Sequence, residues 1–143
     1  MASSVKDLKD HVIVCGYGLV GEKIAELLQQ YRISFVVIEI DKEKAEALKE
    51  KGIPVVWGDA TYSKVLKEAG IERAKAIAIA TDDDAKNLFI LITAKSLNDK
   101  IIIATRANSE IVRNKLKEAG AGYIATPNQS ASEELFRELT KGR

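Results

Sequence analysis

The sequence HVIVCGYGLVGEKIAELL, which spans residues 11–28, decides the fold of this chain. Residues 11–15 form an apolar run, which predicts a buried strand. Residues 22–28 carry apolar side chains at helical spacing, which predicts an amphipathic helix. The glycines between them, Gly16, Gly18 and Gly21, follow the spacing G-x-G-x-x-G. The sequence therefore predicts a strand, a tight turn and a helix in direct succession.

The glycine turn has the composition of a phosphate-binding segment. Gly16 permits the tight turn, Gly18 allows the backbone to approach a pyrophosphate, and Gly21 allows the helix to pack closely on the strand. The unpaired N–H groups at the start of the helix, and the positive end of its dipole, then face the anion. The setting of these glycines, between a strand and a helix, therefore predicts a nucleotide-binding site.

The alternation of strands and helices continues along the chain. Asp41 and Asn108 are expected to cap the helices that follow them. Further strands are predicted over residues 34–39, 54–57, 76–80, 101–105 and 123–125, and helices over 42–51, up to 69, 85–97, 109–119 and 130–140. Because the strands are apolar and joined by short crossovers, we expect a parallel sheet that is buried on both faces. This pattern predicts a single α/β domain, a Rossmann-like, doubly wound sheet of six parallel strands.

Polar residues follow the predicted strands where ligands bind in such sheets, beyond the carboxyl ends. Glu39 ends the second strand, where a carboxylate accepts hydrogen bonds from the ribose diol of adenosine. The same charge repels a 2′-phosphate, so NAD is favoured over NADP. The alternative for Glu39 is a solvated acid at a strand end.

Four further residues at the same edge have two interpretations each. Asp59 either faces an adenine or caps the following helix. Thr81 and Asp82 either line the ligand site or, with the neighbouring aspartates, serve the dipole of the next helix. Arg106 either pairs with a phosphate through its planar donor group or forms a surface salt bridge.

Composition limits the class of protein. The chain has 143 residues, of which 46% are hydrophobic and 30% charged, and a net charge of +1. This suits a soluble domain and gives no general attraction to nucleic acid or anionic lipid. The apolar runs are too short to insert into a membrane, and the N-terminus has no signal-peptide core. A single cysteine excludes an internal disulfide and suits a reducing cytoplasm.

Catalytic and metal-binding side chains are not evident. The only histidine, His11, stands at a strand start and is expected to be structural. None of the four tyrosines has a lysine four residues later, so the tyrosine–lysine pair of short-chain reductases is missing. Cys15 and Trp57 are expected in the core. We therefore predict a protein that is not an enzyme. The alternatives are a small NAD- or S-adenosylmethionine-dependent enzyme of Rossmann type, or a scaffold that has lost its ligand.

Five blocks of the sequence resemble the N-terminal lobe of RCK domains, also called TrkA-N or KTN domains. These blocks are residues 11–21, 36–41, 58–61, 80–84 with Asn87 and Leu88, and 119–121. The resemblance implies a cytoplasmic regulatory domain, at the inner face of the cell membrane, that controls a potassium channel or transporter. It also implies that the effector is NAD(H) or an adenine nucleotide, AMP, ADP or ATP.

The resemblance implies roles for individual residues. Phosphates would lie on the glycines and on the backbone of Tyr17, Leu19 and Val20. Glu39 would hold the ribose, Asp59 and Ala60 would flank the adenine, and Arg106 would approach the distal phosphates. Ile40, next to Glu39, is counted among the binding residues, as are Thr81 and Asp82. Two positions depart from the family pattern. Many relatives have arginine where this chain has Leu19. Calcium-gated relatives place glutamates where Thr105, Arg106 and Ala107 stand, so no calcium site is predicted.

The resemblance also implies an organisation and an assembly. Residues 1–10 would be an N-terminal tail that links to a pore, residues 11–128 the nucleotide-binding lobe, and residues 129–143 the start of a crossover helix, with the second lobe of the family absent. Family members form homodimers and rings of eight lobes on a membrane partner. Apolar faces over residues 88–97 and 111–116 suit either such an interface or ordinary core packing.

Overall fold

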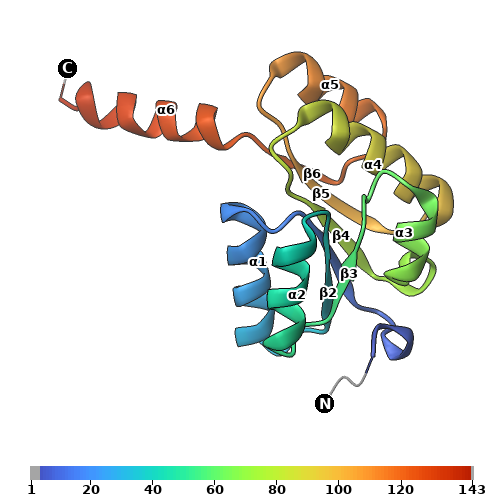
Figure 1. Ribbon diagram of the computed structural model, residues 1–143. Helices are drawn as coiled ribbons and strands as arrows, with labels where there is room; N and C mark the ends of the chain where they lie inside the picture. Colours follow the sequence, from blue (N-terminus) through green and yellow to red (C-terminus); the bar gives the residue numbers. More distant parts are fainter. Residues whose placement is uncertain (1–3, 143) are drawn as a thin grey trace.

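Six parallel strands form one sheet in the computed structural model, which describes residues 4–142. Their order across the sheet is β3-β2-β1-β4-β5-β6, so that β1 and β4 lie at the centre (Figure 1). The strands are β1 (Val12–Cys15), β2 (Phe35–Glu39), β3 (Val55–Trp57), β4 (Ala76–Ile79), β5 (Ile102–Arg106) and β6 (Tyr123–Ala125). This order confirms the predicted doubly wound, Rossmann-like fold.

Helices cover the two faces of the sheet unequally. The helices are α1 (Leu19–Gln30), α2 (Lys42–Glu50), α3 (Ser63–Glu68), α4 (Asp84–Leu97), α5 (Glu110–Glu118) and α6 (Pro127–Leu139), with short 3₁₀ turns η1 (Val5–Asp7) and η2 (Ile71–Arg73). Helices α1 and α2 lie against one face, and α3, α4 and α5 against the other (Figure 1). None of the helices described has both the length and the apolar character needed to cross a membrane.

The alternation of side chains along the central strands produces two cores. Ile13 and Cys15 of β1 face the helices α3–α5 and belong to the larger core. Val14 faces α1 and α2 and packs with Val37 and Leu48 in the smaller one. Burial of apolar area stabilises the fold by roughly 25 cal/mol per Å². The site at the end of β1 therefore lies above a strand whose residues belong to both cores.

The prediction that all strands are buried on both faces was wrong for β5 and β6. Val12, Ala76 and Ile102 are in register across β1, β4 and β5, so they share the face that α1 covers. Ile102 is nevertheless 56% exposed, and Tyr123 of β6 is 70% exposed. The reason is that α1 and α2 pack on β1, β2 and β3. The β5–β6 half of this face is left open.

Three predicted element boundaries or caps were also wrong. Helix α1 begins at Leu19, within the glycine motif, because the extended Gly18 is its N-cap. Helix α6 begins at Pro127 instead of residue 130, since proline loses no hydrogen bond in a first helical turn. The cap of α5 is Ser109 and not Asn108. The Ser109 hydroxyl oxygen accepts a hydrogen bond from the N–H of Val112 at 3.1 Å.

The core predictions held for two residues and failed for Trp57. Cys15 is buried, and this burial raises the pKa of its thiol to about 12. His11 is buried, with Nε2 2.8 Å from the carbonyl oxygen of Ala69, which is a structural role. Trp57 is 57% exposed because β3 is an edge strand, and its indole N–H donates to the carbonyl of Ile40 at 3.0 Å.

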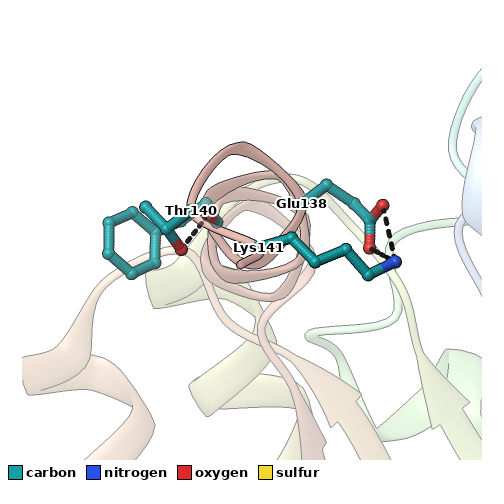
Figure 2. Close-up of polar contacts among 4 residues, drawn as sticks. Glu138, Thr140 and Lys141 are labelled. Carbon is teal, nitrogen blue, oxygen red and sulfur yellow. Dashed lines mark hydrogen bonds and ion pairs between the residues drawn. The ribbon is translucent and has the colours of Figure 1, made fainter. Parts of the chain in front are cut away.

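Helix α6 extends away from the body of the domain (Figure 1). None of its residues is buried. Figure 2 shows that the polar contacts at its end are local: the Lys141 ammonium lies 3.3 Å from the Glu138 carboxylate, and the Thr140 hydroxyl donates to the carbonyl of Phe136. At the other end of the chain, Leu8 is buried in the larger core, while residues 1–3 of the predicted tail and residue 143 of the predicted crossover helix lie outside the described range.

Candidate functional site

Two adjoining hollows lie at the carboxyl edge of the sheet, where the chain leaves β1 and β4 in opposite directions. An open cleft of about 510 Å³ runs along the glycine turn. A smaller pocket of about 50 Å³ lies at the ends of β1, β2 and β3. The predicted residues Gly16, Gly18, Leu19, Ile40, Thr81, Asp82 and Arg106 line the cleft, and Glu39, Asp59 and Ala60 line the pocket. Residues from five strand ends therefore converge.

The three glycines differ in what a side chain would meet. Gly16 has φ +93°, in the left-handed region that glycine adopts without strain. A Cβ atom at Gly21 would lie 1.8 Å from the carbonyl oxygen of Gly16, so only glycine allows α1 to approach β1 this closely. A Cβ atom at Gly18 would have no neighbour within 4 Å. The space in front of Gly18 is therefore open to a ligand.

The N-terminus of α1 lacks a side-chain cap, in contrast to α2, α4 and α5. Asp41, Asp83 and Ser109 cap those helices through their side chains. Gly18 provides no such oxygen, and no acceptor among residues 4–142 receives the N–H groups of Leu19 and Val20. Unsatisfied N–H groups at the positive end of a helix dipole bind anions. The structure thus leaves these donors available to a phosphate. Tyr17, Val20 and Gly21 do not line the cleft themselves.

Glu39 is buried at the end of β2 and lines the smaller pocket. Its Oε2 atom accepts a hydrogen bond from the backbone N–H of Asp41 at 2.8 Å. Its Oε1 atom has no hydrogen-bond partner in the described part of the chain. The carboxylate is therefore held in place by one oxygen, while the other can accept from a ligand hydroxyl. Asp41 itself caps α2, as predicted, by accepting from Glu43 at 2.9 Å.

Asp59 does not cap the helix that follows β3, because the N-cap of α3 is Tyr62. Its Oδ1 atom accepts from the N–H and the hydroxyl of Thr61, at 2.9 and 2.7 Å. Burial alone would raise the pKa of Asp59. The hydrogen bonds from Thr61 and the charge of Lys86 together lower this pKa by more than burial raises it, so the pKa lies below its usual value. An ionised carboxylate is thus fixed beside the pocket.

A buried amide joins the exits of β4 and β5. Asn87 donates to the carbonyls of Thr81 and Arg106, at 3.0 and 3.1 Å, and its own oxygen accepts from the Thr81 hydroxyl. Arg106 donates through Nη2 to the Asn108 side chain at 3.3 Å, and its buried Nε atom has no partner within residues 4–142. The alternative prediction of a surface salt bridge for Arg106 was wrong, since no carboxylate in that range pairs with it.

The three successive aspartates after β4 have separate roles. Asp82 lines the cleft. Asp83 caps α4 by accepting from the N–H of Lys86 at 3.0 Å. Asp84 instead accepts from the backbone N–H groups of Asn108 and Ser109, both at 2.8 Å, and so holds the start of α5. The start of α4 therefore accounts for Asp83, whereas Asp84 serves the start of α5.

Two cations of the site were missed by sequence reasoning. Lys44 and Lys86 both line the cleft, and Lys86 lines the smaller pocket as well. Both lie in the first turn of a helix that follows a strand, where side chains border the carboxyl edge of the sheet. This position in the sequence could have indicated that the two lysines border the site. Among residues 4–142 there is no cluster of three or more His, Cys, Asp or Glu side chains suited to a metal ion.

Comparison with known proteins places the fold and the glycine turn in one family. The sequence matches the TrkA-N domain over residues 12–127. It is 37% identical over 139 residues to potassium channel protein 1 of Methanocaldococcus jannaschii, an alignment that covers 96% of this chain and 42% of the channel protein. The chain therefore spans less than half the length of that relative.

Solved structures agree with this assignment. The TrkA-N domain of the inner membrane protein ybaL from Escherichia coli superposes with a TM-score of 0.89 at 27% identity, over 94% of this chain and 99% of that domain. The GsuK RCK domain superposes with a TM-score of 0.78 at 30% identity, over 91% of this chain and 28% of that chain. Sequence and structure thus lead to the same conclusion: the chain belongs to the TrkA-N domain family.

Proposed function

We propose that this chain is a ligand-sensing regulatory domain that binds NAD(H) or an adenine nucleotide, AMP, ADP or ATP, and controls a potassium channel or transporter. One observation carries the proposal. The uncapped N-terminus of α1 and the half-satisfied carboxylate of Glu39 border adjoining hollows. The first suits a phosphate and the second suits a ribose hydroxyl, and an adenine nucleotide presents both groups.

The proposed placement follows the order of the lining residues. Phosphates lie at the N–H groups of Leu19 and Val20, and the adenosine ribose lies against Glu39. The adenine occupies the side of Ile40, Asp59 and Ala60. Thr81, Asp82 and Arg106 then line the distal end of the ligand, where Arg106 has a buried, unpartnered Nε atom.

Proteins that share this fold support the ligand class. The GsuK channel has been solved bound to NAD, and GsuK also bound to ADP. The Kef CTD of Shewanella denitrificans has been solved in its AMP-bound form. Each of these ligands contains a phosphate and a ribose, and we carry them to this chain as a proposal.

A regulatory role fits the side chains of the site better than a catalytic one. The described lining of the cleft and the pocket contains no histidine or tyrosine, and its one cysteine is Cys15. The raised pKa of the Cys15 thiol, about 12, keeps it protonated and unreactive at neutral pH. The remaining groups bind and orient. We therefore propose an effector site whose ligand shifts an equilibrium between two arrangements of assembled domains.

The energy needed for such a shift is moderate. Moving a two-state equilibrium from 1:99 to 99:1 takes about 5.5 kcal/mol of differential binding, which several identical sites can share. In this proposal residues 11–128 are the sensing lobe, residues 1–10 lead to the membrane subunit, and residues 129–143 begin the helix that crosses to a partner. The domain would act on the cytoplasmic side of the membrane.

Assembly into a homodimer, or a ring of eight lobes, completes the proposal. The α1-side face of β5 and β6 is open, with Ile102 and Tyr123 exposed. Helix α6 projects from the body with Leu135, Phe136 and Leu139 exposed. Phe89, Ile92 and Ile111 add exposed apolar area on α4 and α5, whereas Leu91 and Leu116 of the predicted faces are buried in the core. In this proposal, a second copy of the chain covers each of these exposed apolar surfaces.

Calorimetric titration tests the ligand proposal. We expect NAD⁺, NADH or one of AMP, ADP and ATP to bind the full chain with a Kd below the millimolar range. Glu39→Ala removes the acceptor for the ribose and should weaken binding by about tenfold or more. Glu43→Ala, which removes an exposed acid in the first turn of α2, is the matched control and should bind as the wild type does. Millimolar or absent binding of all five compounds to the wild type contradicts the proposal.

A further inference from the structure

Lys86 occupies the junction of the two hollows. It is half-buried in the first turn of α4 and lines both the cleft and the smaller pocket. The side chain of Asp83 accepts from the Lys86 N–H at 3.0 Å, which fixes the turn that carries it. Its charge also acts on Asp59, whose pKa it helps to lower. Lys86 and Asp59 thus border the same pocket.

The charges around this junction call for a cation. Glu39 and Asp59 are acids, and both border the pocket that Lys86 lines. A phosphate that follows a ribose held by Glu39 is repelled by these carboxylates. Helix α1 offers its N–H groups from one side, but its first residue, Leu19, is apolar and 90% exposed. The α1 side thus supplies donors without a formal charge.

We propose that Lys86 is the cationic partner of the phosphate next to the adenosine ribose, and faces the N-terminus of α1 across that phosphate. The inference rests on the proposed nucleotide site and adds to it the residue that recognises the 5′-phosphate. Two opposed groups, backbone N–H donors and an ammonium, then hold one phosphate. Arg106 lies on β5 and serves the distal end of the cleft.

This role has a consequence for specificity. The 5′-phosphate next to the ribose is common to AMP, ADP and NAD⁺, and adenosine lacks it. Lys86 therefore discriminates phosphorylated nucleotides from the nucleoside, whereas Glu39 binds both through the ribose. A purely structural role for Lys86 affects the binding of adenosine and AMP equally.

The test is calorimetric titration of the full chain with AMP, NAD⁺ and adenosine. Lys86→Gln should weaken the binding of AMP and NAD⁺ by about tenfold, which is the effect of losing one charge-assisted hydrogen bond. The affinity for adenosine should stay unchanged. Lys86→Arg keeps the charge and should retain most of the affinity for AMP. Lys95→Gln, at the far end of the same helix, is the matched control and should behave as the wild type.

The outcomes separate this inference from the function on which it rests. Binding of AMP to the wild type and to Lys86→Gln with equal affinity overturns the role of Lys86 and leaves the proposed function intact. An equal loss for AMP and adenosine also overturns it, because the lysine then shapes the pocket without recognising phosphate. Failure of the wild type to bind any of the three compounds overturns the proposed function, and the role of Lys86 with it.

Discussion

At the scale of single residues, the glycine turn separates a structural requirement from a functional one. Gly21→Ala places a Cβ atom 1.8 Å from the carbonyl oxygen of Gly16, so α1 must move off β1. We expect a loss of about 3 kcal/mol in the free energy of unfolding. Gly18→Ala meets no atom within 4 Å and has an ordinary φ of −82°, so stability should change by less than about 1 kcal/mol.

The Gly18→Ala variant should instead impair ligand binding. The methyl group of Gly18→Ala enters the space in front of the α1 N–H groups, so we expect weaker AMP binding in a nearly unchanged fold. Urea denaturation measures the stabilities and calorimetry the affinities. Equal stability of the two variants, or unimpaired AMP binding by Gly18→Ala, contradicts this division of roles.

Asp59 gives a prediction on pH. Because its folded-state pKa lies below the reference value of 3.8, ionised Asp59 stabilises the fold above that pH and this contribution is lost as the pH falls through the folded pKa. NMR titration of the side-chain carboxyl should show a midpoint below 3.8. Lys86→Gln removes the charge that helps to lower the pKa of Asp59, so the midpoint should rise. A midpoint above the reference value in the wild type contradicts the assignment.

Much of the site could be predicted from local sequence, and the rest required tertiary structure. The glycines and Glu39 are identified by their positions after buried strands, because the carboxyl ends of parallel strands meet at one edge. The place of Lys86 in the first turn of the helix after β4 indicates only that it lies near this edge, and that its side chain lines both hollows is a tertiary property. Trp57 was misplaced for a similar reason, since its apolar character did not reveal that β3 is an edge strand.

At the scale of elements, one side chain connects two helices. The Asp84 carboxylate, in the first turn of α4, accepts from the N–H groups of Asn108 and Ser109 at the start of α5. Asp84→Ala leaves both donors without this acceptor and should cost about 2 kcal/mol of stability, as measured by urea denaturation. Asp82→Ala is the control, because no hydrogen bond to its carboxylate is found in the described chain. Equal stability of the two variants contradicts the connection.

The sequence predicted the strands and helices more closely than it predicted which parts of the sheet the helices cover. Alternation of apolar runs and amphipathic segments predicted six strands and the helices between them, and the boundaries moved by a few residues at Leu19 and Pro127. The open face at Ile102 could not be predicted, because β-branched residues are typical of strands whether or not a helix covers them. The direction of α6 is likewise a tertiary property.

At the scale of the whole molecule, the projecting helix should control association. We expect the full chain to sediment as a dimer or a larger ring, and a chain ending at residue 126 to be monomeric. The double variant Phe136→Glu and Leu139→Glu places two charges on the apolar side of α6 and should also dissociate the assembly. Arg137→Glu, a charge change at another exposed position of the helix, is the control. A monomeric wild type at high concentration contradicts the proposed assembly.

The most direct test of the central claim is a crystal structure of the full chain with AMP or NAD⁺. The account predicts a phosphate that accepts from the N–H groups of Leu19 and Val20, with the ribose hydroxyls donating to Glu39 and the Lys86 ammonium beside the same phosphate. A nucleotide bound elsewhere on the domain, or a complex in which Glu39 contacts only the N–H of Asp41, would contradict it.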